Sequence, residues 1–151
     1  MKVTAVTPFI VDPGYGKNWL FVKVETSDGL HGWGECYTQA DRDQSIAAHV
    51  GQLARYLIGR DAGHIRHFTH WAYHDFAAKR GAMDFWSAVS GIEQALWDLA
   101  GKRLGVPVVS LLGGPAASAS ACTPTAGTPA PRRRRPTPPR RRRPSPAASP
   151  R

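Results

Sequence analysis

One long amphipathic stretch in the second half of the body constrains the fold more than any other feature. Its large apolar residues recur at i, i+4, i+7, i+11 and i+14, and they are Phe85, Val89, Ile92, Leu96 and Leu99. This spacing puts them on one stripe of an α-helix, which predicts that the stripe is buried. Gly91 and Gly101 lower the helix propensity, so we expect another backbone element to approach closely at both positions. Gly105 and Pro107 predict the end of the helix.

The chain before this helix begins with three segments of β-strand character. Residues 3–11 are rich in β-branched side chains, residues 19–26 alternate between apolar and polar, and residues 31–37 form a third short run. Ser27, Asp28 and Gly29 suit a hairpin turn. Pro8 has no N–H, which places it on an edge strand or at a bulge. Strands this close in sequence predict an antiparallel meander.

Two helices are expected between the strands and the long helix. The first covers residues 44–58, is capped by Asp41 or Asp43, and buries Ile46, Val50, Leu53 and Leu57. The second covers residues 64–78 and buries Ile65, Phe68, Trp71 and Ala72. Strands followed by helices predict an α+β fold, a three-stranded antiparallel meander followed by a helical bundle, for residues 1–114.

The composition changes abruptly at residue 115. Residues 1–114 hold eleven Lys/Arg and eleven Asp/Glu, so the net charge of +9 comes from nine arginines in residues 115–151. That segment also holds ten of the thirteen prolines and contains no Val, Ile, Leu, Met or aromatic residue. With nothing to bury, it cannot offset the entropy of ordering. We expect a disordered Arg/Pro-rich tail.

The long helix and the turn after it carry a family pattern. The pattern consists of Ser90-Gly91, Ile92, Glu93, Ala95-Leu96, Asp98, Gly101-Lys102, Pro107, Val108 and Leu111-Leu112-Gly113. It resembles the helix signature of the mandelate racemase/muconate lactonising enzyme group of the enolase superfamily. The segments WLFVKVET, GWGE and ALWDLAGK and the connector at residues 79–81 are most similar to acid-sugar dehydratases of the galactonate/mannonate type. The resemblance implies that residues 1–114 form the N-terminal capping domain.

The resemblance also implies where the chemistry lies. In this family a (β/α)8 barrel of about 250 residues follows the cap. The barrel holds acidic ligands for Mg²⁺ and Lys or His bases that remove a proton next to a carboxylate. Only 37 residues follow Gly114, and they contain no Asp, Glu, Lys or His. We therefore expect a truncated member that lacks the barrel, has no catalytic residue, metal ligand or cofactor of its own, and turns over no sugar acid alone.

In the resembled family the cap contributes specificity, because two of its loops close over the barrel mouth. Here these loops are residues 12–18 and 36–40. The expected contacts with a small sugar acid are Tyr15, Lys17, Asn18, Tyr37, Thr38 and, in the connector, Arg80. The alternative for each is simple solvation of a loop.

Histidines form a second group of interest. His67, His70 and His74 are spaced i, i+3, i+7 on one expected helix. This spacing fits either a metal-binding face or a solvated face, and the second is favoured because Phe68 and Trp71 define a separate buried side. On the long helix, Asp98 is expected to pair with Lys102 or to cap backbone groups.

The tail permits two interpretations. Arginine, proline and alanine are what GC-rich DNA encodes in a shifted frame, so the tail could be a frameshift product. Alternatively, the protein is a non-enzymatic module whose arginine runs bind nucleic acid or another polyanion. These runs are Arg132, Arg133, Arg134, Arg135, Arg140, Arg141, Arg142 and Arg143. Without interleaved aromatics they offer no base stacking.

The remaining expectations concern partners and compartment. The cap could form a homo-oligomer or join an intact homologue. Cys36 and Cys122 lie far apart without C-x-x-C spacing, which argues against a disulfide framework or a zinc site. The N-terminus has no signal-peptide pattern, and no apolar run reaches the roughly 20 residues of a membrane span. We expect a cytoplasmic protein.

Overall fold

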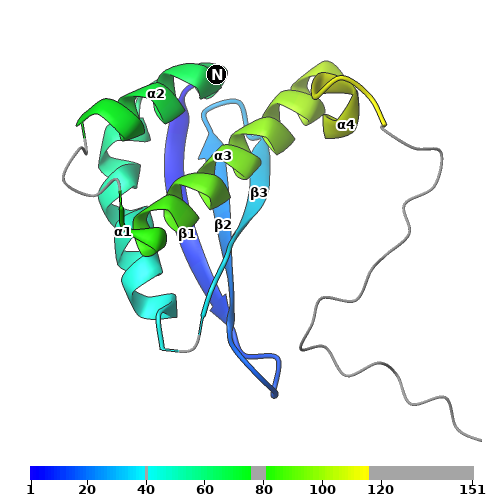
Figure 1. The fold of residues 1–151 in the computed structure, drawn as a ribbon. Coiled ribbons are helices and arrows are strands. Elements are labelled where there is room, and N and C mark those ends of the chain that lie inside the picture. The colour runs from blue at the N-terminus through cyan, green and yellow to red at the C-terminus, as the bar shows by residue number, and fades with distance from the viewer. Residues whose placement is uncertain (40, 76–80, 116–151) are drawn as a thin grey trace, which may run out of the picture. The chain divides into compact units, whose positions relative to one another are not determined.

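The computed structural model describes residues 1–39, 41–75 and 81–115. Three strands come first and helices follow, as the α+β prediction required (Figure 1). The elements are β1 (Val3–Val11), β2 (Trp19–Thr26), β3 (His31–Cys36), α1 (Asp43–Leu57), α2 (Ile65–Asp75), α3 (Met83–Leu104) and α4 (Val108–Leu111). Residues 116–151, which include both arginine runs, lie outside the described residues.

The three strands form one antiparallel sheet in the order β1-β2-β3. Val22 of β2 lies opposite Pro8 on one side and opposite Gly34 on the other. Pro8 therefore sits on an edge strand, as its missing N–H predicted. Gly29 has φ +84° in the β2–β3 turn, a conformation that L side chains rarely adopt.

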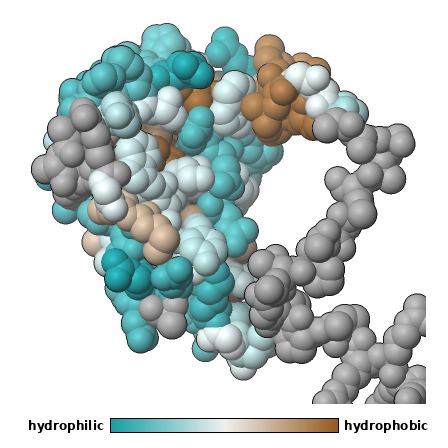
Figure 2. Space-filling model, in the orientation of Figure 1, coloured by the Kyte–Doolittle hydropathy of each residue, from teal (hydrophilic) through white to brown (hydrophobic). Residues whose placement is uncertain are grey.

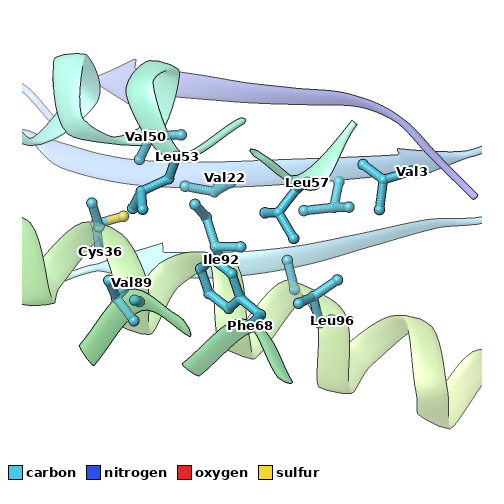
Figure 3. Close-up of a cluster of buried hydrophobic side chains, with 14 of the residues drawn as sticks. Val3, Val22, Cys36, Val50, Leu53, Leu57, Phe68, Val89, Ile92 and Leu96 are labelled. Carbon is cyan, nitrogen blue, oxygen red and sulfur yellow. The ribbon is translucent and has the colours of Figure 1, made fainter. Parts of the chain in front are cut away.

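The core lies between one face of the sheet and the helices. Val22 is fully buried at the centre of β2. Figure 3 shows it among Leu53 of α1 and Ile92 and Leu96 of α3, which belong to the same buried cluster. The predicted apolar stripe of α3 is buried along its whole length, which confirms the helical period.

The start of α1 differs from the prediction. Neither Asp41 nor Asp43 is the N-cap, which is Arg42. Asp43 is the first helical residue, and its carboxylate accepts a hydrogen bond from the side chain of Asn18 at 2.8 Å. Asp41 has φ +62°. The capping prediction is wrong: Asp43 lies inside the first turn, where Oδ1 accepts a hydrogen bond from the Gln44 amide at 3.0 Å while Oδ2 binds Asn18.

In α2, Ile65, Phe68 and Ala72 are buried as predicted, but Trp71 is only half-buried. Its ring packs against Tyr56 of α1, with the ring centroids 4.4 Å apart. The Trp71 ring therefore packs at the edge of the α1–α2 contact, outside the fully buried core. The end of the expected helix, residues 76–78, lies outside the described residues.

Glycines let α3 lie directly on β3. A Cβ at Gly34 would overlap the carbonyl oxygen of Gly91, and a Cβ at Gly91 would overlap the sulfur of Cys36. At Gly101 an added Cβ would lie 2.8 Å from the carbonyl oxygen of Val106. The predicted close approaches at Gly91 and Gly101 are confirmed. We call the contact of β3 with α3 the glycine seam.

Side chains of α3 also form hydrogen bonds with the backbone groups on the outer edge of β3. The Trp33 amide donates to Asp98 Oδ2 at 2.9 Å, and the Glu35 amide donates to Gln94 Oε1 at 3.1 Å. Lys102 Nζ donates to the His31 carbonyl at 2.8 Å. Residues 94, 98 and 102 are each four apart, so they form one row on the helix. This row pairs with strand backbone that would otherwise be an open edge.

In the part of the chain that the structure describes, every helix is too short or too polar to cross a bilayer.

Candidate functional site

The two loops predicted to contact substrate leave the sheet at the same end. Val11, where β1 ends, lies opposite Trp19, and Leu20 lies opposite Cys36, where β3 ends. The loop after β1 and the loop after β3 therefore start side by side (Figure 1). Sheet topology alone brings together segments about twenty residues apart in sequence.

A set of polar contacts joins the two loops, and we call it the loop clip. Lys17 Nζ donates to the Thr38 carbonyl at 2.5 Å and lies 4.1 Å from the centroid of the Tyr37 ring. The Thr38 hydroxyl donates to the Asn18 carbonyl, and Thr38 is only 2% exposed. A cation over an aromatic face and two hydrogen bonds thus hold one loop on the other.

The loop clip continues into α1. Asn18 Nδ2 donates to Asp43 Oδ2 at 2.8 Å, and this hydrogen bond lowers the pKa of the Asp43 carboxyl. The Asn18 amide and the Thr38 hydroxyl are therefore engaged within the protein. Tyr15 and Tyr37 are 75% and 56% exposed, although one face of the Tyr37 ring packs against Lys17.

The first loop is shaped locally. Asp12 Oδ1 accepts a hydrogen bond from the Gly14 amide at 2.7 Å, and Gly14 and Gly16 both have positive φ, at +78° and +73°. An aspartate that bonds the backbone two residues on forms a tight turn. This turn carries Tyr15 at its exposed tip. The sixth predicted contact, Arg80, lies outside the described residues.

The comparison with known protein families is decisive at this point. The model of the mandelate racemase/muconate lactonizing enzyme N-terminal domain matches residues 14–113. The chain belongs to this family. The resemblance drawn from the α3 pattern is thereby confirmed.

Among relatives of known name, the chain is similar to D-galactonate dehydratases. It is 44% identical over 114 residues to that of Xanthomonas campestris pv. campestris (strain B100) and 42% identical to that of Verminephrobacter eiseniae (strain EF01-2). Each alignment covers 76% of this chain and 28% of the relative. The chain thus spans little more than a quarter of these enzymes, and the predicted similarity to acid-sugar dehydratases is confirmed for that part.

Solved structures of the superfamily share the fold. A mandelate racemase/muconate lactonizing enzyme from Sulfitobacter sp. aligns with a TM-score of 0.69 at 31% identity, covering 78% of this chain and 31% of that one. The 3,6-anhydro-D-galactonate cycloisomerase of Zobellia galactanivorans aligns with a TM-score of 0.68 at 28% identity, covering 76% and 32%.

A second polar area lies beside the loop clip. Glu35, Tyr37, Ser90 and Gln94 line a shallow pocket between the end of β3 and α3. Gln94 Nε2 donates to Ser90 Oγ at 3.2 Å. The sequence analysis did not identify Ser90 or Gln94 as site residues. Their spacing of four on a helix, away from the apolar stripe, was the available signal.

Asp98, one of the two acidic residues of the family pattern, has a structural role here. Asp98 Oδ2 accepts a hydrogen bond from Lys102 Nζ at 2.8 Å and also one from the Trp33 amide. The prediction that Asp98 pairs with Lys102 and caps backbone is confirmed. Its carboxylate binds the backbone of β3 and the Lys102 ammonium, which indicates a structural role.

An apolar surface surrounds the exit of α3. The side chains of Leu104, Val106, Val109 and Leu112 are exposed. Figure 2 shows a hydrophobic patch over α4 and the adjoining end of α3. Contiguous exposed apolar surface of this kind marks an interaction site.

The metal of the resembled enzymes does not fit these residues. Among residues 1–39, 41–75 and 81–115, no three His, Cys, Asp or Glu side chains lie close enough together to hold an ion. We therefore assign no magnesium ligand to the described residues and derive no step through a metal. His67, His70 and His74 all lie on the exposed side of α2, a position that the solvated face and the metal-binding face both require.

Proposed function

We propose that residues 1–114 are the capping domain of an acid-sugar dehydratase, and that their two loops close over a sugar acid bound in a (β/α)8 barrel. The observation that carries the proposal is the loop clip, which joins the two loops that the family uses for specificity. The similarity to D-galactonate dehydratases supports the substrate class.

In this proposal each group has a physical task. The Lys17 ammonium, held by the Thr38 carbonyl and the Tyr37 ring, places positive charge where an anionic substrate arrives. The exposed phenols of Tyr15 and Tyr37 offer hydrogen bonds to sugar hydroxyls. Closure of the loops excludes water while a proton is removed next to the carboxylate.

The proposal assigns the metal and the base to a barrel, supplied by a longer form of the chain or by another polypeptide. The apolar patch at Leu104, Val106, Val109 and Leu112 supports this, because it offers the surface that such a barrel would cover. The described residues then contribute substrate contacts, and we expect no dehydration of sugar acids by the 151-residue chain alone.

A chimaera tests the proposal. Residues 1–114 replace the matching cap of a D-galactonate dehydratase, and magnesium-dependent dehydration of a panel of sugar acids is measured. We expect activity, and we expect Tyr37→Phe to lower kcat/KM roughly three- to tenfold, the value of one hydrogen bond to substrate. Tyr73→Phe, on α2 away from both loops, is the matched control and should leave kcat/KM unchanged. A folded chimaera that dehydrates no sugar acid, or dehydration by the purified chain alone, would overturn the proposal.

The arginine runs at residues 132–135 and 140–143 favour a second candidate function, the binding of nucleic acid or another polyanion. Neutralising several phosphates makes affinity fall steeply with salt and ignore sequence. Affinity for a DNA duplex, measured against salt with and without residues 115–151, tests it. Equal salt slopes in both forms would exclude a role for the arginines.

A further inference from the structure

The exposed side of α2 carries two imidazoles that stand side by side. His70 and His74 are four residues apart, and their ring centroids are 4.2 Å apart. The opposite side of the helix is fixed in the core by Ile65, Phe68 and Ala72, so the histidine side faces solvent. Figure 1 places α2 at the end of the sheet away from the β1–β2 loop. The cap function leaves this pair unexplained.

We propose that His70 and His74 form a two-ligand binding site for a divalent transition-metal ion of borderline softness, such as Cu²⁺, Ni²⁺ or Zn²⁺. Imidazole nitrogen is a preferred ligand of these ions. Two histidines at i and i+4 on one helix face are also the spacing of helical zinc sites. The rings are tilted by 41° and are exposed, so small side-chain rotations converge their nitrogens on one ion.

The site takes two protein ligands, and water completes the coordination. His67 lies on the same exposed side, but no third metal-ligating side chain among the described residues joins the pair closely enough. The affinity order should follow Cu²⁺ over Ni²⁺ and Zn²⁺. Mg²⁺ prefers oxygen ligands in an octahedron and should not bind at this pair.

The metal salts alone are the probes. Binding of Ni²⁺ and Zn²⁺ to the full chain is measured by titration calorimetry and by the shifts of histidine side-chain NMR signals. A Cys122→Ser background removes a competing thiol. We expect His70→Ala and His74→Ala each to raise the Kd at least about tenfold, because the helix holds the second imidazole at high effective concentration.

His67→Ala is the matched control, since it removes an exposed histidine of the same helix but not of the pair. It should leave the Kd unchanged, as should an excess of Mg²⁺. Equal weakening by all three variants, or none by His70→Ala, would overturn the site. Circular dichroism verifies that the exposed substitutions leave the fold intact. We expect the histidine substitutions to leave the dehydration activity of the chimaera unchanged. The metal-site proposal and the capping-domain proposal can therefore fail independently of each other.

Discussion

The glycine seam makes Gly34→Ala the sharpest test of the fold. A Cβ at Gly34 would overlap the Gly91 carbonyl oxygen and would stand 2.8 Å from the Ala95 amide nitrogen. Ordinary van der Waals contact begins at 3.4 Å, so the Ala95 contact alone requires β3 and α3 to separate by 3.4 − 2.8 = 0.6 Å. Both obstacles are backbone atoms of a helix, which cannot rotate away as a side chain would.

The loss of stability comes from the contacts between β3 and α3 that the separation weakens. A gap of 0.5–1 Å forfeits a quarter to a half of each dispersion contact across it, and overpacking of a core typically costs about 1–3 kcal/mol. The hydrogen bonds of Trp33 and Glu35 to α3 also lengthen, at about 1 kcal/mol for each one lost. We expect Gly34→Ala to lower the free energy of unfolding by about 2–4 kcal/mol. At roughly 4–8 °C per kcal/mol, Tm falls by roughly 8–32 °C.

Urea unfolding of the full chain, followed by circular dichroism and tryptophan fluorescence, measures the effect as a lower midpoint at unchanged slope. Gly51→Ala is the matched control. It lies exposed on α1, and among the described residues no atom beyond its own helix stands within 4 Å of an added Cβ. It should stabilise by about 0.5–1 kcal/mol through helix propensity. A Gly34→Ala midpoint equal to the native one would refute the seam argument.

Three further changes probe other contacts. Hydrogen bonds from Arg42 and Ser45 lower the Asp84 pKa, so their stabilisation is present above the unfolded pKa near 3.9 and is lost in acid. Asp84→Asn should lower the free energy of unfolding by about 1–2 kcal/mol at pH 7, and the urea midpoints of variant and native protein should converge below pH 4. A difference in midpoint that does not change with pH would contradict this. Burial raises the Cys36 pKa to about 12. In a Cys122→Ser background, alkylation of Cys36 at pH 8 should therefore be at least about 100-fold slower in the folded protein than in the urea-unfolded protein. The free energy of unfolding should also fall as the pH rises above about 9, where the thiol of the unfolded chain ionises. Thr38→Val removes the hydroxyl that donates to the Asn18 carbonyl and should speed amide exchange in both clipped loops, whereas acceleration in the second loop alone would refute their coupling.

The sequence predicted the elements because their patterns are local. The stripe from Phe85 to Leu99 has a helical period, and the alternation around Val22 has a strand period. Each period places apolar groups on one side whatever the neighbouring elements are. Gly91 was informative for a related reason, since a glycine inside a helix lowers stability unless something must come close.

The contacts that the sequence did not predict depend on two distant segments meeting. Asp43 was predicted as a possible helix cap, but it is the first helical residue, and its carboxylate also binds the Asn18 side chain of a distant loop. Ser90 and Gln94 acquire meaning only once the register of β3 on α3 is known. The loop clip likewise requires that the loops after β1 and β3 leave one end of the sheet. Tertiary partners decide such roles, and no local pattern encodes them.

The glycine seam and the loop clip are physically one construction. The seam brings the α3 backbone onto β3 as far as Cys36, and the Asp98 and Gln94 side chains then hold the outer edge of the same strand. Tyr37 and Thr38 follow Cys36 directly, so the position of the second loop is set by how β3 sits on the helix. The polar row of α3 therefore fixes the strand that leads into the second loop, and so positions the substrate contacts proposed for Tyr37. In the function proposed above, the loops contact the substrate, while the polar side chains of α3 bind the strand backbone.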